Sequence, residues 1–412
     1  MINELHTSPS SFKAVRLTDN VFWVGAIDWT TRNFHGYYTS RGTTYNAYLI
    51  ISEKITLIDT VKSPFKEEMF ARITSVIDPK AIRYIISNHA EPDHTGALAW
   101  TIEKVHPEKI FASKMGAKAL NAHYGMDEIT TVEDNIELDI GGLTLSFINT
   151  PMLHWPDSMF SFLKEEHLLF SQDAFGMHLA SGKRFADQID EYIISEEAAK
   201  YYANILMPYS SIVSKLIEKL SSSGIKFNII APDHGPIYRK NKDIDWIIKQ
   251  YSSWALNKPK TKAVIVYDTM WQSTELMARA IAEGINISKV TPLLYPMGSS
   301  HRSDVAAALL DAGALIVGSP TLNNNIFPSV ADLLTYIKGL KPTNLIGTAF
   351  GSYGWSGEAT NQIKQTLEEM HVNIITDPIK VKYVPKDNDL ISCQRLGCSL
   401  GEHLAKGETN ND

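Results

Sequence analysis

The chain has 412 residues, of which 44% are hydrophobic and 21% are charged, and its formal net charge is −7. This length accommodates two large domains with a core each, and the acidic balance disfavours nucleic acid as a partner. The longest uncharged stretch, residues 312–331, contains two Pro and three Asn, which is untypical of a membrane span. Residues 1–6 lack the basic and apolar regions of a secretory signal. We therefore expect a cytoplasmic protein that binds neither nucleic acid nor membrane.

The first half of the chain begins with strand signals. Residues 20–60 alternate apolar runs with Gly and Thr turns, and residues 48–51 and 55–59 are expected to form a hairpin. The next apolar run, residues 82–86, predicts a buried strand. Strands and helices then alternate as far as residue 234, which is consistent with an αββα sandwich.

A dense cluster of metal-binding side chains follows the strand at 82–86. Residues 89, 91 and 93 share parity, so an extended backbone directs all three side chains to one side. Pro92 disfavours a helical conformation in the residue before it and predicts a loop at the strand end. The cluster of His89, Glu91, Asp93 and His94 therefore predicts a metal site.

Three further donors occur later, each after a strand-like run and each bounded by Pro or Gly. His154 lies within residues 149–158, Asp173 follows the apolar run 168–170, and His234 follows the run 228–231. Taken singly, a histidine is more often structural than a ligand. The ordered set of four histidines and three carboxylates is sufficient for two metal ions that share one carboxylate.

The first cluster resembles the His-x-His-x-Asp-His signature of the metallo-β-lactamase superfamily, with Glu91 in place of the second histidine. This resemblance implies an αββα fold for the first half of the chain. Imidazole-rich ligation suits zinc, whereas additional carboxylates are harder donors that bridge ions and favour iron or manganese.

The second half carries an independent pattern. A helix over residues 243–255 leads into the polar stretch 257–261, which predicts a junction between a domain at 1–256 and a domain at 257–412. Residues 262–267 predict a strand, and residues 276–284 predict a helix that ends at Gly284. The hydroxyl-rich turn between them is typical of a phosphate site, although many such turns bind nothing.

Two later strand patterns, at 314–318 and 345–350, also lead into polar loops. The three loops together resemble those of flavodoxin, a doubly wound parallel sheet that binds FMN at its switch point. The match lacks the Gly that is common in the flavodoxin phosphate loop, where this chain has Gln272. The resemblance implies the following FMN-binding candidates: Thr269, Met270, Gln272, Ser273, Thr274, Pro320, Thr321, Asn323, Asn324, Asn325, Ser352, Tyr353, Gly354, Trp355 and Gly357.

The order of a diiron-type lactamase domain and a flavodoxin-like domain resembles the flavodiiron proteins, also called A-type flavoproteins. The resemblance implies FMN and two non-haem iron ions that reduce O2 to water, NO to N2O, or both, and we favour O2. It also implies the metal allocation: His89, Glu91 and His154 on one iron, Asp93, His94 and His234 on the other, and Asp173 as the bridge. A zinc-dependent hydrolase of the lactamase fold is a further alternative, which Glu91 and the fused flavin domain disfavour.

Two side chains are candidates to act on the bound diatomic molecule. His35 and Tyr201 are possible hydrogen-bond donors, although Tyr201 fits the role of a helix packing residue equally well. The family resemblance also implies an external electron donor, which is rubredoxin, a flavoprotein reductase or reduced F420, and a head-to-tail homodimer or homotetramer. Cys393 and Cys398 do not form the two Cys pairs of a fused rubredoxin module, and two thiols suit a reducing compartment.

Overall fold

The computed structural model describes residues 11–222 and 224–408. The N-terminal residues 1–6, in which we expect no secretory signal, lie outside this part of the chain. Contacts between residues group the chain into two compact units. The first comprises Met1–His35, Thr39–Tyr201 and Ser211–Ser252, and the second comprises Gly36–Tyr38, Tyr202–Ser210 and Ser253–Asp412.

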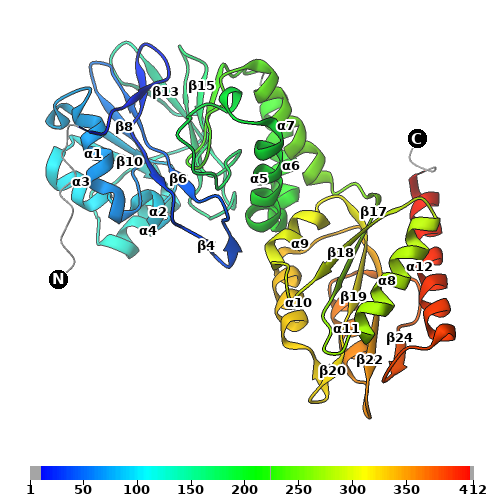
Figure 1. Cartoon of the computed structure of the whole chain (residues 1–412). Helices are drawn as coiled ribbons and strands as arrows, with labels where there is room; N and C mark the ends of the chain where they lie inside the picture. The colour runs from blue at the N-terminus through cyan, green and yellow to red at the C-terminus, as the bar shows by residue number, and fades with distance from the viewer. Residues whose placement is uncertain (1–10, 223, 409–412) are drawn as a thin grey trace, which may run out of the picture. The chain divides into compact units, whose positions relative to one another are not determined.

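The first unit contains two main β-sheets (Figure 1). The first sheet has the order β1-β2-β7-β8-β9-β10-β11, with bounds Val15–Arg16, Val21–Trp23, Tyr48–Ile50, Thr56–Ile58, Tyr84–Ser87, Lys109–Ser113 and Thr130–Val132. The second has the order β12-β13-β14-β15-β16, with bounds Glu137–Asp139, Thr144–Asn149, Met159–Leu163, Leu168–Phe170 and Ile229–Ala231. The expected hairpin is confirmed, because β7 and β8 pair antiparallel.

The two sheets share one hydrophobic core. Ile58 and Ile86 from the first sheet pack with Phe147, Phe170 and other side chains from the second. The opposite face of the first sheet is covered by helices through Met69, Ile73, Leu98 and Leu120, and α6 and α7 lie beside the second sheet (Figure 1). The sandwich predicted from the sequence is therefore confirmed, since helices flank two facing sheets.

The helices of this part of the chain are α1 Lys66–Thr74, α2 Pro92–Thr95, α3 Leu98–Val105, α4 Lys114–Tyr124, α5 Glu191–Tyr201, α6 Ser210–Ser222 and α7 Asn241–Leu256. Two small sheets complete this part of the chain. One pairs β3 Ala26–Asp28 with β6 Thr43–Tyr45, and the other pairs β4 Asn33–Phe34 with β5 Tyr37–Tyr38. Short 3₁₀ or π turns are η1 Ser63–Phe65, η2 Pro79–Ala81, η3 Ala186–Gln188, η4 Tyr202–Leu206 and η5 Met207–Tyr209.

The loop predicted at the end of β9 is confirmed for residues 88–91 and is wrong for residues 92–95, which form the short helix α2. Pro92 occupies the first helical turn, where its missing N–H has no helical partner to lose. Glu91 retains the extended conformation that proline imposes on the residue before it, with φ −63° and ψ 142°. The helical turn changes the direction of the chain between Glu91 and the Asp93–His94 pair.

The second unit is a parallel sheet covered by helices on both faces. Its strand order is β18-β17-β19-β22-β23, and β24 pairs with the C-terminal end of β22. The bounds are β17 Lys260–Tyr267, β18 Thr291–Pro296, β19 Ala312–Gly318, β22 Ile346–Tyr353, β23 Asn373–Ile374 and β24 Ile379–Lys382, with a small hairpin of β20 Thr321–Leu322 and β21 Asn325–Ile326. This strand order is the doubly wound order of flavodoxin and confirms the predicted fold class.

Helices of the second unit form two layers. Side chains of α9 Arg302–Leu309, α10 Pro328–Leu340 and α11 Ala359–Glu369 pack on one face, and those of α8 Ser273–Ile287 and α12 Asp387–Glu408 pack on the other (Figure 1). The prediction that the helix after β17 ends at Gly284 is wrong, because α8 continues to Ile287. A Cβ at Gly284 would lie 2.0 Å from the Gln394 carbonyl of α12, so this glycine permits close helix packing instead.

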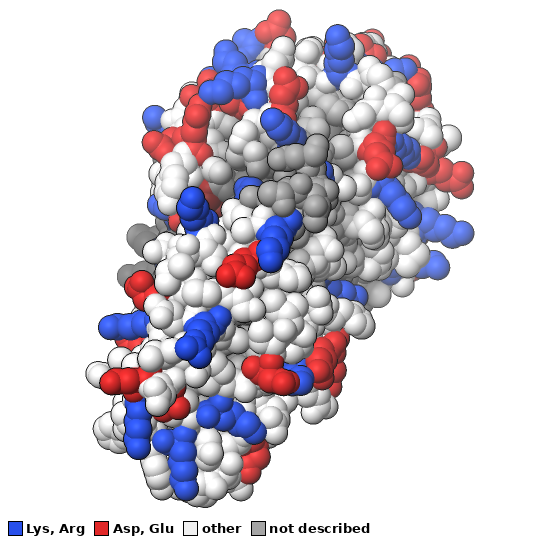
Figure 2. Space-filling view, turned by 90° about the vertical axis from the view of Figure 1, so that its right-hand side faces the viewer, with Lys and Arg blue, Asp and Glu red and all other residues white. Residues whose placement is uncertain are grey.

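Acidic and basic side chains are interspersed over the face of the molecule shown in Figure 2. Such a mixture produces short-range pairs rather than one extended field of a single sign. Among the described residues, no helix is both long and apolar enough to cross a membrane.

Candidate metal centre and flavin pocket

The seven predicted metal donors lie in segments that follow the carboxyl ends of four strands. Four donors follow β9, namely His89 and Glu91 in the loop and Asp93 and His94 in α2, whereas His154 lies between β13 and β14. Asp173 follows β15, and His234 follows β16. The structure brings all seven together in two adjoining groups of candidate ligands. A buried strand followed by a polar loop is the local pattern that places each donor at the edge of the sandwich.

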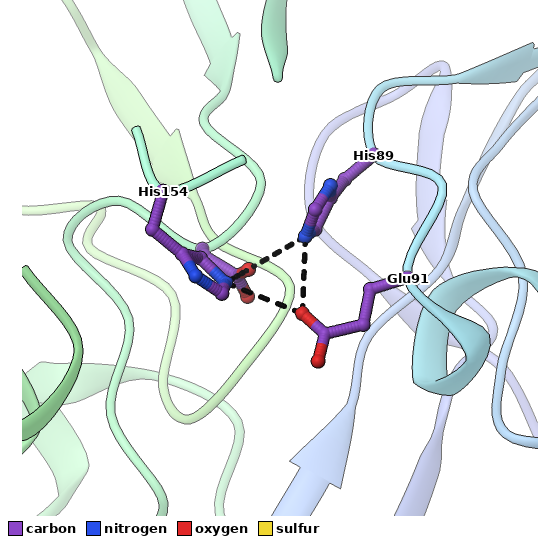
Figure 3. Close-up of side chains that lie close together, drawn as sticks. His89, Glu91 and His154 are labelled. Atoms are coloured by element: carbon purple, nitrogen blue, oxygen red, sulfur yellow. Dashed lines mark hydrogen bonds and ion pairs between the residues drawn. The ribbon is translucent and has the colours of Figure 1, made fainter. Parts of the chain in front are cut away.

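The first group consists of His89, Glu91 and His154 together with Asp173. Figure 3 shows the His89 imidazole and the Glu91 carboxylate, which come from one loop, converging with the His154 imidazole from another. Glu91 Oε2 lies 3.1 Å from His89 Nε2 and 3.2 Å from His154 Nε2. The donor atoms of the group all lie within 4.8 Å of one another, which allows a single ion to contact them all.

The second group consists of Asp93, His94 and His234. Asp93 Oδ1 lies 3.3 Å from His94 Nε2, and Asp93 Oδ2 lies 3.1 Å from His234 Nε2. Each group therefore offers two imidazoles and one carboxylate of its own. Two histidines and one carboxylate, with other positions open, are the donor set typical of non-haem ferrous sites.

Asp173 extends one oxygen to each group. Its Oδ2 lies 3.0 Å from His154 Nε2 and 3.4 Å from His89 Nε2. Its Oδ1 lies 3.3 Å from His94 Nε2 and 3.4 Å from His234 Nε2. This is the geometry expected of a carboxylate that bridges two ions.

A metal pair fits the polar atoms that are present. Asp93, His94 and Asp173 are almost fully buried, and within the described chain both Asp93 oxygens, both His94 ring nitrogens and Asp173 Oδ1 lack a hydrogen-bond partner. Buried polar atoms without partners cost free energy unless another ligand satisfies them. Cations between these atoms would remove that cost.

The charges of the centre are mutually compensating. Burial works against the charged form of His89, yet its contacts with Asp157, Glu91 and Asp173 raise its pKa to about 10. Burial similarly opposes ionisation of Asp173, but His94, His154 and His89 hold its pKa well below the usual range. The carboxylates therefore favour positive charge at the centre, which metal ions provide in place of ring protons.

The two predicted auxiliary residues lie beside this centre. His35 Nε2 is 2.5 Å from Glu91 Oε1, and the His35 side chain is about half exposed (54%). Tyr201 ends α5, is buried, and packs its ring 5.0 Å from His178 and 6.2 Å from His234, measured between centroids. Tyr201 is thus both a packing residue and a neighbour of the metal donors, so the two interpretations of it are compatible.

The structure adds residues that sequence reasoning missed. His178 is buried with Nδ1 2.9 Å from Thr43 Oγ1, and burial together with His234 lowers its pKa well below the usual range. Asp157 Oδ2 lies 3.0 Å from His89 Nδ1. The position of Asp157, three residues after His154, was a usable local signal. No local signal distinguishes His178, since its role depends on contacts with distant parts of the chain.

In the second unit, the three predicted loops surround a cavity of about 390 Å³ at the carboxyl ends of the parallel strands. This volume is within the range of about 300–1,000 Å³ for ligand pockets. The predicted residues that line it are Met270, Ser273, Pro320, Thr321, Asn323, Asn324, Ser352, Tyr353, Gly354 and Trp355. Trp271 and Trp355 at its border are 87% and 85% exposed, and flat exposed rings of this kind can cover an isoalloxazine.

Five predicted residues lie next to the cavity without lining it. Thr274 Oγ1 is 3.0 Å from Ser352 Oγ, which lines the cavity. A Cβ added at Gly357 would lie 3.1 Å from the Tyr353 ring. Thr269 and Gln272 are in the loop before α8, and Asn325 is in β21. Lining residues missed from the sequence are Trp271, Leu322, Ser356 and Tyr383. Tyr383 follows β24, which only the fold brings to the pocket.

The phosphate loop fits an anion because it leads into the N-terminus of the 15-residue helix α8. Gln272 precedes that helix with φ 64°, a left-handed conformation at the position where flavodoxins commonly have Gly. A non-glycine residue in this conformation is strained by about 1–2 kcal/mol. The backbone thus adopts a glycine-type geometry without a glycine.

We expect Gln272→Gly to stabilise the second unit by about 0.5–1 kcal/mol, because relief of strain exceeds the added entropy of the unfolded chain. Urea unfolding followed by flavin fluorescence measures this change. Gln272→Ala is the matched control, since alanine retains the strain and is expected to give no gain. A lower midpoint for Gln272→Gly would contradict the account.

Comparisons with known proteins agree with both halves of the structure. A family model described as ODP family beta lactamase matches residues 43–235, and one described as Flavodoxin matches residues 265–397. The chain is 44% identical to a nitric oxide reductase of Moorella thermoacetica, over 95% of this chain and 99% of that protein. It is 46% identical to rubredoxin-oxygen oxidoreductase of Megalodesulfovibrio gigas, over 95% and 98% respectively.

Similarity to solved structures extends over the whole fold. The flavodiiron protein from Giardia intestinalis is 34% identical, with a TM-score of 0.93 and coverage of 97% of this chain and 98% of that one. The order of a lactamase-like unit with two groups of candidate metal ligands and a flavodoxin unit is shared with oxidoreductases that combine these two folds. This chain belongs to the flavodiiron protein family.

Proposed function

We propose that this protein reduces O2 to water at a diiron centre held by His89, Glu91, His154, Asp173, Asp93, His94 and His234. The observation that carries the proposal is Asp173, whose two carboxylate oxygens face the two groups of imidazoles separately. We assign this centre to residues 1–256 and an FMN site to residues 257–412, where the pocket of the flavodoxin unit supports it. Bound FMN and iron would supply the electrons for the reduction of a diatomic molecule.

The chain itself orients the ligands and handles protons. His35 holds Glu91 Oε1, so that Oε2 remains directed at His89 and His154. The hydrogen bond to Glu91 raises the pKa of His35 despite partial burial, which favours a proton at Nε2. Because His35 is half exposed, this nitrogen can pass protons from solvent towards the centre, and reduction of O2 to water consumes protons.

Tyr201 is proposed as a second donor. Burial, and then the neighbouring carboxylates, raise its pKa well above the usual range, so its hydroxyl retains its proton. A buried hydroxyl that remains protonated can donate a hydrogen bond to a bound diatomic molecule. The His178 ring lies 5.0 Å from the Tyr201 ring, and the Phe34 ring, 4.7 Å from that of His178, adds apolar surface that suits an apolar substrate.

Two alternative functions remain. Reduction of NO to N2O requires the same donor set and is supported by the similarity to the Moorella nitric oxide reductase. A zinc hydrolase is disfavoured by the mixed carboxylate and histidine donors and by the fused flavodoxin unit. Metal analysis together with an absorption spectrum distinguishes the hydrolase from the two reductases, because zinc and the absence of flavin colour would support the hydrolase.

We expect the fully reduced protein to be oxidised rapidly by O2, in a single turnover, and more slowly by NO. Anaerobic stopped-flow mixing with each gas separately measures both rates through the flavin absorbance. His35→Ala should lower the O2 rate by about 100-fold or more, the contribution typical of a positioned proton donor. Rapid turnover with NO and a sluggish reaction with O2 would instead establish the alternative function.

The remaining expectations concern partners and location. We propose a rubredoxin-type electron donor, supported by the 46% identity to rubredoxin-oxygen oxidoreductase; a flavoprotein reductase and reduced F420 are the alternatives. We further propose a head-to-tail homodimer or homotetramer in the cytoplasm. Sedimentation of the purified protein tests assembly, and a fully active monomer would refute it.

A further inference from the structure

The second ring nitrogens of His89, His94 and His234 face different kinds of partner. That partner fixes which nitrogen carries the proton, holds the ring in place and increases the basicity of the nitrogen on the metal. A carboxylate does this more strongly than a neutral carbonyl, because its hydrogen bond is charge-assisted. The partners of His89, His94 and His234 therefore indicate how firmly each group binds its ion.

The first group has a fixed carboxylate partner. Asp157 Oδ2 lies 3.0 Å from His89 Nδ1 and accepts the Ala90 N–H at 2.6 Å. The Asp157 carbonyl accepts the Ser113 hydroxyl at 2.7 Å. His89, Asp157 and Ser113 are all buried. With Nδ1 as the donor to Asp157, His89 Nε2 presents a lone pair towards Glu91 and Asp173.

The second group has weaker partners. His234 Nδ1 is 2.6 Å from the neutral carbonyl of Thr44. His94 Nδ1 lies 3.6 Å from Asp233 Oδ2, which is beyond hydrogen-bond distance. Among these three ring nitrogens, only His89 Nδ1 is hydrogen-bonded to a carboxylate.

We propose that Asp157 is a positioning residue that holds His89 Nε2 on its metal and makes the first group the tighter of the two iron sites. This inference rests on the proposed diiron function. It attributes the expected difference in affinity between the two sites to one side chain that is not among the candidate ligands. The two ions should therefore leave the protein at different rates.

The test is iron release from the loaded wild-type protein to a ferrous chelator, followed by absorbance. We expect two phases, of which the slow one belongs to the first group and is absent in Glu91→Ala. Asp157→Ala should accelerate the slow phase by about 10–100-fold, the usual effect of losing such a partner. Asp157→Asn should accelerate it less, because the amide oxygen can still accept both N–H groups. Asp233→Asn is the matched control and should leave the slow phase unchanged within about threefold.

Several outcomes would overturn the inference. An unchanged slow phase in Asp157→Ala is one, and equal acceleration of both phases is another, because it indicates general loosening. If Asp157→Ala does not fold, Asp157→Asn decides, and a rate within threefold of the wild type is the negative result. A wild-type protein that binds no iron would refute the proposed function instead, so the two failures are distinguishable.

Discussion

Asp173→Ala should reduce the iron content from two ions per chain to one or none and abolish reduction of O2 and NO. The physical reason is that Asp173 faces both groups, with Oδ2 towards His154 and Oδ1 towards His94. Loss of even an outer partner typically costs 10–100-fold in affinity or activity, so we expect turnover to fall by more than about 100-fold. Iron analysis and stopped-flow oxidation measure the two effects.

The flavin provides the internal control for this variant. Chemical reduction of FMN should persist at the wild-type rate, because the candidate flavin pocket is lined by residues of the second unit. Asp187→Ala is a matched control, since Asp187 is a partly exposed aspartate paired with Arg239. Two retained irons and full turnover in Asp173→Ala would show that the assigned bridge is wrong.

Gly284→Ala should destabilise the second unit by about 3 kcal/mol or more and release FMN. Its Cβ would lie 2.0 Å from the Gln394 carbonyl and 2.8 Å from the Cys398 amide nitrogen. Both are backbone atoms of α12, which cannot rotate away as a side chain does, so the helices must separate. Overpacking of a close contact typically costs 1–3 kcal/mol and sometimes more.

Urea unfolding and flavin retention after gel filtration measure this effect. Gly339→Ala in α10 is the matched control, because a Cβ there meets no atom within 4 Å. That variant should gain up to about 1 kcal/mol from alanine's higher helix propensity. Equal stabilities for the two variants would contradict the packing argument, whereas loss of iron in Gly284→Ala would show that its effect extends beyond the flavodoxin unit.

Much of the site could be predicted from the sequence because its signals are local. A buried strand followed by a polar loop requires only a few neighbouring residues, and this pattern located His89, Asp173 and His234. The doubly wound fold class of the second half was predictable from the alternation of strand and helix patterns and from the resemblance of its three loops to those of flavodoxin. The prediction at Gly284 was wrong because a glycine can either end a helix or allow another helix to pack closely against it. Only the position of α12 distinguishes these two roles.

By itself, the sequence determined the chemical identity of the candidate metal donors, the strand periodicity and the order of the two folds. Only the tertiary structure decided which donors share a group, that Asp173 faces both, and that Asp157 is the partner of His89. It also placed Tyr383 at the flavin pocket. The physical reason is the separation along the chain over which each interaction acts. Hydrophobic periodicity and turn preferences depend on residues that are close in sequence. The hydrogen bonds and metal ligation of this site depend on distances between segments that are remote in sequence and are set by their packing.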